Sequence, residues 1–140
     1  MNIERWNDIF KLLAMVIIAD KRVYKEEVDA FVGSAMAIKA AVSDDTLITR
    51  DMAFEWFRGH RDEILALSKT PDYSVTALRI IMSMTDFKHR GAVLRAMVTV
   101  SMADEEFHPS EESMIVIAAA HWKLKLPELK NVKPAQFPKG

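Results

Sequence analysis

The chain has 140 residues, half of them apolar, and its 19 basic and 20 acidic residues almost balance. This length suits one domain with a real core, and the charge balance argues against nucleic-acid binding and against a disordered chain. Because the chain has no cysteine, disulfides, thiolate metal sites and cysteine catalysis are excluded.

Helical periodicity runs along nearly the whole chain. Apolar residues recur at three- and four-residue steps from Ile3 to Ile17, which predicts one apolar stripe on a first helix. The same spacing predicts further helices over 28–38, 53–67, 76–84, 91–103 and 111–124. Gly59 is expected to bend or divide the third helix, and Pro71 suits the first turn of the fourth. We therefore expect an all-α, single-domain bundle of about seven helices over 1–126, followed by a loosely ordered C-terminal tail over 127–140.

No segment of the sequence predicts a membrane span or a secretory signal. The longest apolar runs, such as LLAMVIIA, are far shorter than the ~20 residues needed to cross a bilayer. The N-terminal MNIERWNDIF contains two acids and lacks a long apolar stretch. A cytoplasmic location is the expectation that fits these features.

A short acidic segment occurs twice. ADKRVYKEEV (19–28) aligns without gaps on ADEEFHPSEE (103–112), and each copy lies between two apolar helical segments. The alignment places Asp20 on Asp104 and Glu27 on Glu111. An internal duplication of a helix–acidic loop–helix unit is the economical interpretation.

This pattern, A-D-x-x-apolar-x-x-x-E between two apolar helices, resembles the TerB-like family of tellurite-resistance and stress-response modules. AMVTVSMADEEFHPSEESMIVIAAA (96–120) is the closer match, and MVIIADKRVYKEEVDAF (15–31) carries the same signature. AFEWF (53–57) resembles the middle of family members. One position departs from the family pattern, because the glycine that usually follows the aspartate is replaced by Lys21 and Glu105.

The resemblance implies an all-helical, duplicated domain, and its pattern establishes no catalytic role. It also implies a link to tellurite or other chemical stress and divalent-cation binding at the acidic positions. Docking to a protein partner at the inner membrane surface is the third implication. Peripheral attachment of a cytoplasmic protein to that membrane would follow.

The acidic loops suggest a specific cation site. If the two units pack about a pseudo-two-fold axis, the carboxylates of Asp20, Glu27, Asp104 and Glu111 converge. Four oxygen ligands without sulfur suit a hard ion such as Ca²⁺ or Mg²⁺, and no organic cofactor is indicated. We therefore expect a non-catalytic module that binds a partner protein, and a divalent cation, through paired acidic loops.

Other interpretations of the same residues stay open. Acids in the first turn of a helix are favoured by the helix dipole without any metal, and Asp20 has basic neighbours that can neutralise it. A metal-dependent enzyme would use the same carboxylates, with His108 as acid or base. A pure scaffold would bind no ion at all.

Two further groups of residues favour structural roles. Phe54, Trp56 and Phe57 are expected in the core, as are the methionines Met82, Met84, Met97 and Met102. HRD (60–62) is similar to a kinase catalytic loop but lacks its companion motifs, so it is interpreted as chance.

Overall fold

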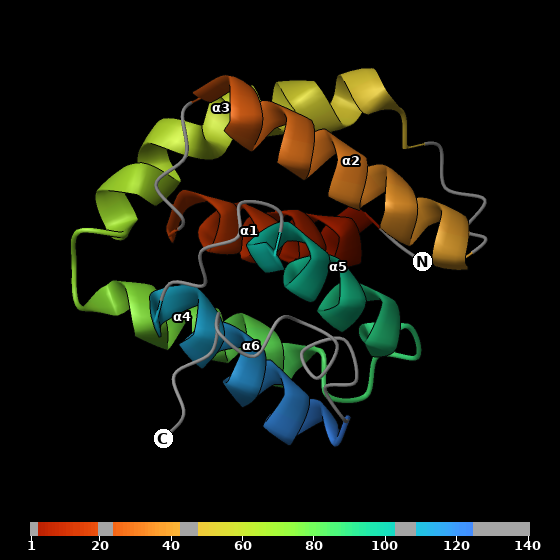
Figure 1. Cartoon of the computed structure of the whole chain (residues 1–140), viewed down its shortest axis with the longest axis vertical. Helices are drawn as coiled ribbons and strands as arrows, with labels where there is room; N and C mark the ends of the chain where they lie inside the picture. Colours follow the sequence, from red (N-terminus) through yellow and green to blue (C-terminus); the bar gives the residue numbers. More distant parts are fainter. Residues whose placement is uncertain (1–2, 20–23, 43–47, 103–108, 125–140) are drawn as a thin grey trace.

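The computed structural model describes residues 3–19, 24–42, 48–102 and 109–124. Within these ranges the side chains are described as well, except those of residues 3, 19, 101–102 and 109–113. They form six helices in one bundle (Figure 1): α1 Ile3–Ala19, α2 Tyr24–Val42, α3 Arg50–Leu67, α4 Asp72–Ser83, α5 Arg90–Met102 and α6 Pro109–Trp122. The described ranges contain no strand, so the all-α prediction is confirmed. The tail over 127–140 lies outside them.

The expected count of about seven helices is one too high for the described residues. α3 passes through Gly59 without a break, because one glycine lowers helix stability by only about 1 kcal/mol relative to alanine. None of the described helices has both the length and the apolar character needed to cross a bilayer.

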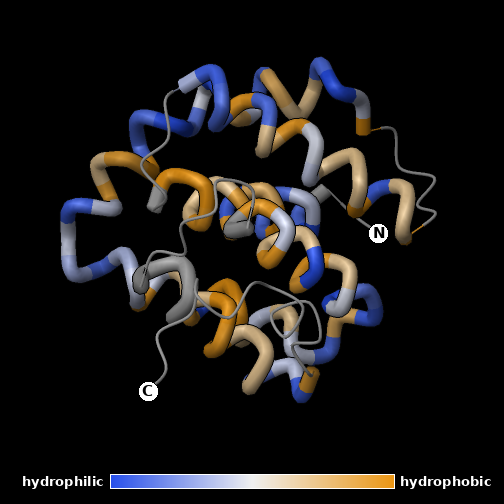
Figure 2. The backbone as a smooth tube through the Cα atoms, viewed as in Figure 1, coloured by the Kyte–Doolittle hydropathy of each residue, from blue (hydrophilic) through white to orange (hydrophobic). Residues whose placement is uncertain are grey.

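α1 is the central helix of the bundle. It contacts each of the other five helices, and every residue from Leu12 to Ile18 is buried. The predicted single apolar stripe holds over residues 4–11, where Trp6, Ile9 and Phe10 are buried and polar residues occupy the other side. Residues 12–18 are instead apolar around the whole circumference of the helix. Figure 2 shows the contrast with α3 and the turn after it, where hydrophilic residues are frequent along the tube.

Two helix ends have identifiable capping interactions. Thr49 caps α3, because its hydroxyl accepts a hydrogen bond from the Met52 backbone N–H at 3.1 Å. α6 ends in a Schellman turn: Lys123 has a φ of 57°, and the Leu124 N–H donates to the Ala119 carbonyl at 2.9 Å. A lysine therefore occupies a left-handed position that glycine usually takes.

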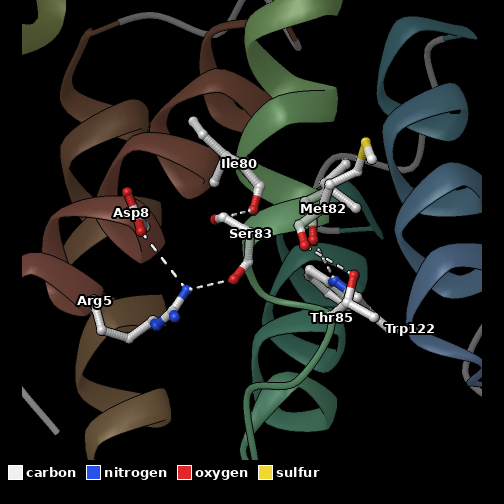
Figure 3. Close-up of polar contacts among 8 residues, drawn as sticks. Arg5, Asp8, Ile80, Met82, Ser83, Thr85 and Trp122 are labelled. Atoms are coloured by element: carbon white, nitrogen blue, oxygen red, sulfur yellow. Dashed lines mark hydrogen bonds and ion pairs between the residues drawn. The ribbon is translucent and has the colours of Figure 1, made fainter.

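Polar contacts fasten the C-terminal end of α4 to α1 and α6. The buried indole of Trp122 donates to the Ile81 carbonyl at 2.8 Å, and Arg5 of α1 donates to the Ser83 carbonyl at 3.2 Å (Figure 3). Arg90, the first residue of α5, donates to the Trp122 carbonyl at 3.1 Å. The Ser83 and Trp122 carbonyls lie at helix ends, where the last carbonyls have no partner within the helix. The Ile81 carbonyl accepts the indole N–H in addition to the Met84 backbone N–H at 3.1 Å.

The core side chains only partly match the sequence-based expectation. Phe57 is fully buried, while Phe54 and Trp56 are half-buried against the core. Met84 and Met97 are buried as expected, but Met82 is 54% exposed, because its side of α4 is not covered by described residues. The Met102 side chain lies outside the described ones.

Candidate functional site

The two acidic loops leave from helix ends that lie on the same side of the bundle. The first loop joins α1 to α2, and the second joins α5 to α6. In Figure 1 the C-terminal ends of α1 and α5 and the N-terminal ends of α2 and α6 are the left-hand ends of these helices. α1 contacts α2, α5 and α6, and α2 contacts α5. The four ends therefore belong to helices that pack against one another.

The described residues include only part of the predicted ligand set. Asp20 and Asp104 lie outside them, and Glu111 lies in α6 with its side chain outside them. Glu27 is described in full, in the first turn of α2. No group of three histidine, aspartate or glutamate side chains that could hold a metal ion occurs among the described residues.

Glu27 is a buried carboxylate in an ion pair. It is 2% exposed, and its Oε1 accepts a hydrogen bond from Nε of Arg61 in α3 at 2.6 Å. Its position in the first turn of α2 also places the negative charge near the positive end of the helix dipole. Burial of a carboxylate is costly unless it is paired and hydrogen-bonded, so Arg61 makes the burial of Glu27 tolerable.

Arg61 is held in place by more than Glu27. Its guanidinium lies over the Tyr24 ring, 5.2 Å from the ring centroid, and Tyr24 in turn lies against Phe57. The hydrogen bond to Glu27 raises the pKa of Arg61 above its ordinary value, so the group stays charged. A cation bound by Glu27 would therefore have to share the carboxylate with a fixed positive charge or displace it.

Sequence reasoning missed Arg61. It is 34 residues from Glu27 along the chain, and only the packing of α3 on α2 brings the two together. The one local signal, its place in HRD, suggested a resemblance to another fold and carried no information about an ion pair.

A second polar site lies between α1 and α3. A cavity of about 280 Å³ is lined there by Asn7, Lys11, Trp56, His60, Glu63 and Ile64. Nδ1 of His60 lies 2.7 Å from the Trp56 carbonyl oxygen, which can only accept, so Nδ1 carries the proton. The His60 ring also stacks on the Trp56 ring, with centroids 4.1 Å apart. These contacts give His60 a packing role in this wall of the cavity.

Comparison with known proteins identifies the family to which the chain belongs. The family model described as tellurite resistance protein TerB matches residues 8–133. The matched segment includes both acidic loops, with the positions of Asp20, Glu27, Asp104 and Glu111. Neither the curated proteins nor the solved structures give a match.

Proposed function

Because the chain belongs to the tellurite-resistance family TerB, we propose that it is a non-catalytic binding module in the response to tellurite or a related chemical stress. In this proposal its two acidic loops hold one divalent cation, Ca²⁺ or Mg²⁺, and the acidic face docks a protein partner at the inner membrane surface. Asp20, Glu27, Asp104 and Glu111 are the proposed ligands, supplied by two copies of a duplicated helix–loop–helix unit.

This proposal rests on the observation that four helix ends lie on the same side of the bundle. α1 and α5 run in the same direction in Figure 1, and α2 and α6 begin where they end. Two loops that leave from neighbouring helix ends can bring their carboxylates to one ion. Oxygen ligands from acidic side chains are those that Ca²⁺ and Mg²⁺ prefer.

Cation binding would then control the acidic face. Several carboxylates at one end of the bundle repel one another, and a bound cation relieves that repulsion. The ion also links the α1–α2 unit to the α5–α6 unit. A partner that recognises the linked arrangement would distinguish the loaded module from the empty one.

Calorimetric titration with Ca²⁺ and with Mg²⁺ tests the cation site. We expect heat of binding from the natural chain and its loss in both Asp20→Asn and Asp104→Asn. Asp51→Asn is the matched control, because Asp51 is exposed in the first turn of α3 and belongs to neither loop. Equal heats in all four chains, or no heat in any, would exclude the cation site and leave a scaffold.

Glu27→Gln separates the two roles open to Glu27. If Glu27 is a ligand, the substitution weakens cation binding. If Glu27 serves only Arg61, the affinity is unchanged and only the free energy of unfolding falls. Growth in tellurite of cells that depend on this chain gives a second readout for the aspartate variants, with Asp51→Asn again as control.

A further inference from the structure

An apolar groove lies between α2 and α5. Its cavity volume is about 330 Å³. The described residues that line it are mostly small: Asp29, Ala30, Gly33, Ser34, Ala37, Ile38, Ala41, Ala92, Arg95, Ala96, Thr99 and Val100. α2 and α5 run antiparallel in Figure 1, so the groove has one end near Asp29 and the other near Ala41 and Ala92.

The α2 wall of this groove differs from an ordinary solvated helix face. Gly33, Ala37 and Ala41 recur every four residues and are exposed, with no charged residue among them. A Cβ added at Gly33 would meet no atom within 4 Å, so the wall is open. Figure 2 shows α2 largely in pale and orange tones. Small residues at this spacing allow another helix to approach closely.

Ser34 supplies a second, independent observation. It lines the groove, is only 8% exposed, and its hydroxyl has no hydrogen bond to any described residue. A buried hydroxyl without a partner is unfavourable, and most such groups in proteins are satisfied. The groove therefore contains a polar group that an occupant could satisfy.

We propose that this groove is a self-association surface, and that its occupant is the same face of a second copy of the chain. A two-fold axis crossing α2 at right angles near Ser34 lays the α2 helices of the two copies antiparallel on one another. The two Ser34 hydroxyls then meet near the axis, where each can act as donor or acceptor for the other. The small residues on either side allow the backbones to come close.

The charges along the groove favour this occupant. Asp29 lies at one end, and Arg95 lies in the half nearer Ala41. A two-fold axis between them brings Asp29 of each copy toward Arg95 of the other, because an isologous interface reverses the order of its residues. The guanidinium has five donors, so Arg95 can serve this carboxylate in addition to contacts within its own chain.

Sedimentation velocity from about 1 µM to about 1 mM protein tests the association. We expect the mass to rise from that of one 15.9 kDa chain to that of two. Gly33→Leu should weaken the association at least about tenfold, since the new side chain would stand in the groove, at a position where an added Cβ meets nothing within 4 Å in the monomer. Gly59→Leu is the matched control, at another glycine whose added Cβ meets nothing within 4 Å, and should leave the association unchanged.

Charge reversal tests the pairing across the axis. Asp29→Arg alone and Arg95→Asp alone should each associate poorly. An equal mixture of the two variants should associate again, because each then offers charges complementary to the other. Damage to the fold of one variant would not be corrected by adding the second, and circular dichroism checks the fold of each separately.

A single cysteine locates the axis. The chain has no cysteine, so any disulfide formed by Ser34→Cys must join two copies. We expect a covalent dimer on mild oxidation from Ser34→Cys and none from Ala40→Cys, an exposed α2 position outside the groove. A single-chain mass over the whole concentration range, together with no cross-link at position 34, would overturn the proposal.

Discussion

The two halves of the bundle, α1–α3 and α4–α6, are packed with different side chains. In the first half, aromatic rings form a continuous cluster around Phe31, which lies 4.8 Å from Phe57, 5.4 Å from Phe10 and 5.6 Å from Trp56 between ring centroids. Among the described residues of the second half, Trp122 is the one aromatic side chain that is fully buried.

This difference predicts how single substitutions change the stability of each half. A cluster of rings shares its packing energy among several large contacts, so its members can partly replace one another. The second half relies on one indole that both fills space and donates to Ile81. We therefore expect single substitutions to affect the second half at fewer positions but more strongly.

Truncation of the central aromatic residue in each half is the test with the largest expected effect. Trp122→Ala should lower the free energy of unfolding by about 5 kcal/mol, and Phe31→Ala by about 3–4 kcal/mol, since the former removes a hydrogen bond in addition to the packing. Urea unfolding of both variants measures the difference. A greater loss from Phe31→Ala would reverse the comparison.

Disruption of the Glu27–Arg61 ion pair, beside the aromatic cluster, should cause the next largest loss of stability. Arg61→Met leaves the Glu27 carboxylate buried without its partner, which should destabilise the fold by about 3 kcal/mol. The double variant Glu27→Leu, Arg61→Met should recover most of this loss, because it removes the unpaired charge.

Arg58→Met is the control for the loss of an arginine from α3. Arg58 pairs with Glu55 at 2.6 Å, but both side chains are more than half exposed, so no change in melting temperature is expected. Equal destabilisation by Arg58→Met and Arg61→Met would show that burial of Glu27 is not the cause.

Removal of the cap of α3 should have a smaller effect. Thr49→Ala deletes the acceptor for the Met52 N–H and should cost about 1 kcal/mol. Thr49→Ser keeps the hydroxyl and should stay close to the natural chain in thermal unfolding. If Ser and Ala behave alike at this position, the hydrogen bond contributes little.

The smallest changes in stability are expected from substitution of two helical glycines, one in each half of the bundle. Gly59→Ala lies within α3 and should stabilise the fold by about 0.5–1 kcal/mol, because alanine loses less backbone entropy in a helix. Gly91→Ala lies in the first turn of α5, where helix propensity matters less, and should gain less. Melting temperatures of the two variants compare the halves directly.

Much of the fold could be predicted from the sequence, because helix type follows from apolar spacing alone. The predicted starts at 28, 53 and 76 fall three or four residues after the observed starts at Tyr24, Arg50 and Asp72. First turns of helices are often polar, so they carry no apolar periodicity by which to recognise them. The burial of α1 on all sides over residues 12–18 depends on neighbouring helices, which no local pattern describes.

The candidate site was less predictable. The place of Glu27 in the first turn of a helix follows from local sequence, and the family was recognisable from the two acidic segments. The Arg61 partner depends on how α3 packs against α2, and nothing near Glu27 in the sequence specifies it. The open α2 wall was also hidden, since alanine and glycine give little contrast between an exposed and a buried helix face.

The hydrogen bond from Trp122 to Ile81 has a spectroscopic consequence. The chain has three tryptophans, and Trp6 and Trp56 belong to the half formed by α1–α3. A chain in which both are replaced by phenylalanine would contain one emitter, buried between α6 and α4. Its fluorescence emission maximum would report the separation of those two helices, while circular dichroism would report the helix content. Partial opening of the bundle would then be visible as a shift of the emission maximum before the helices melt.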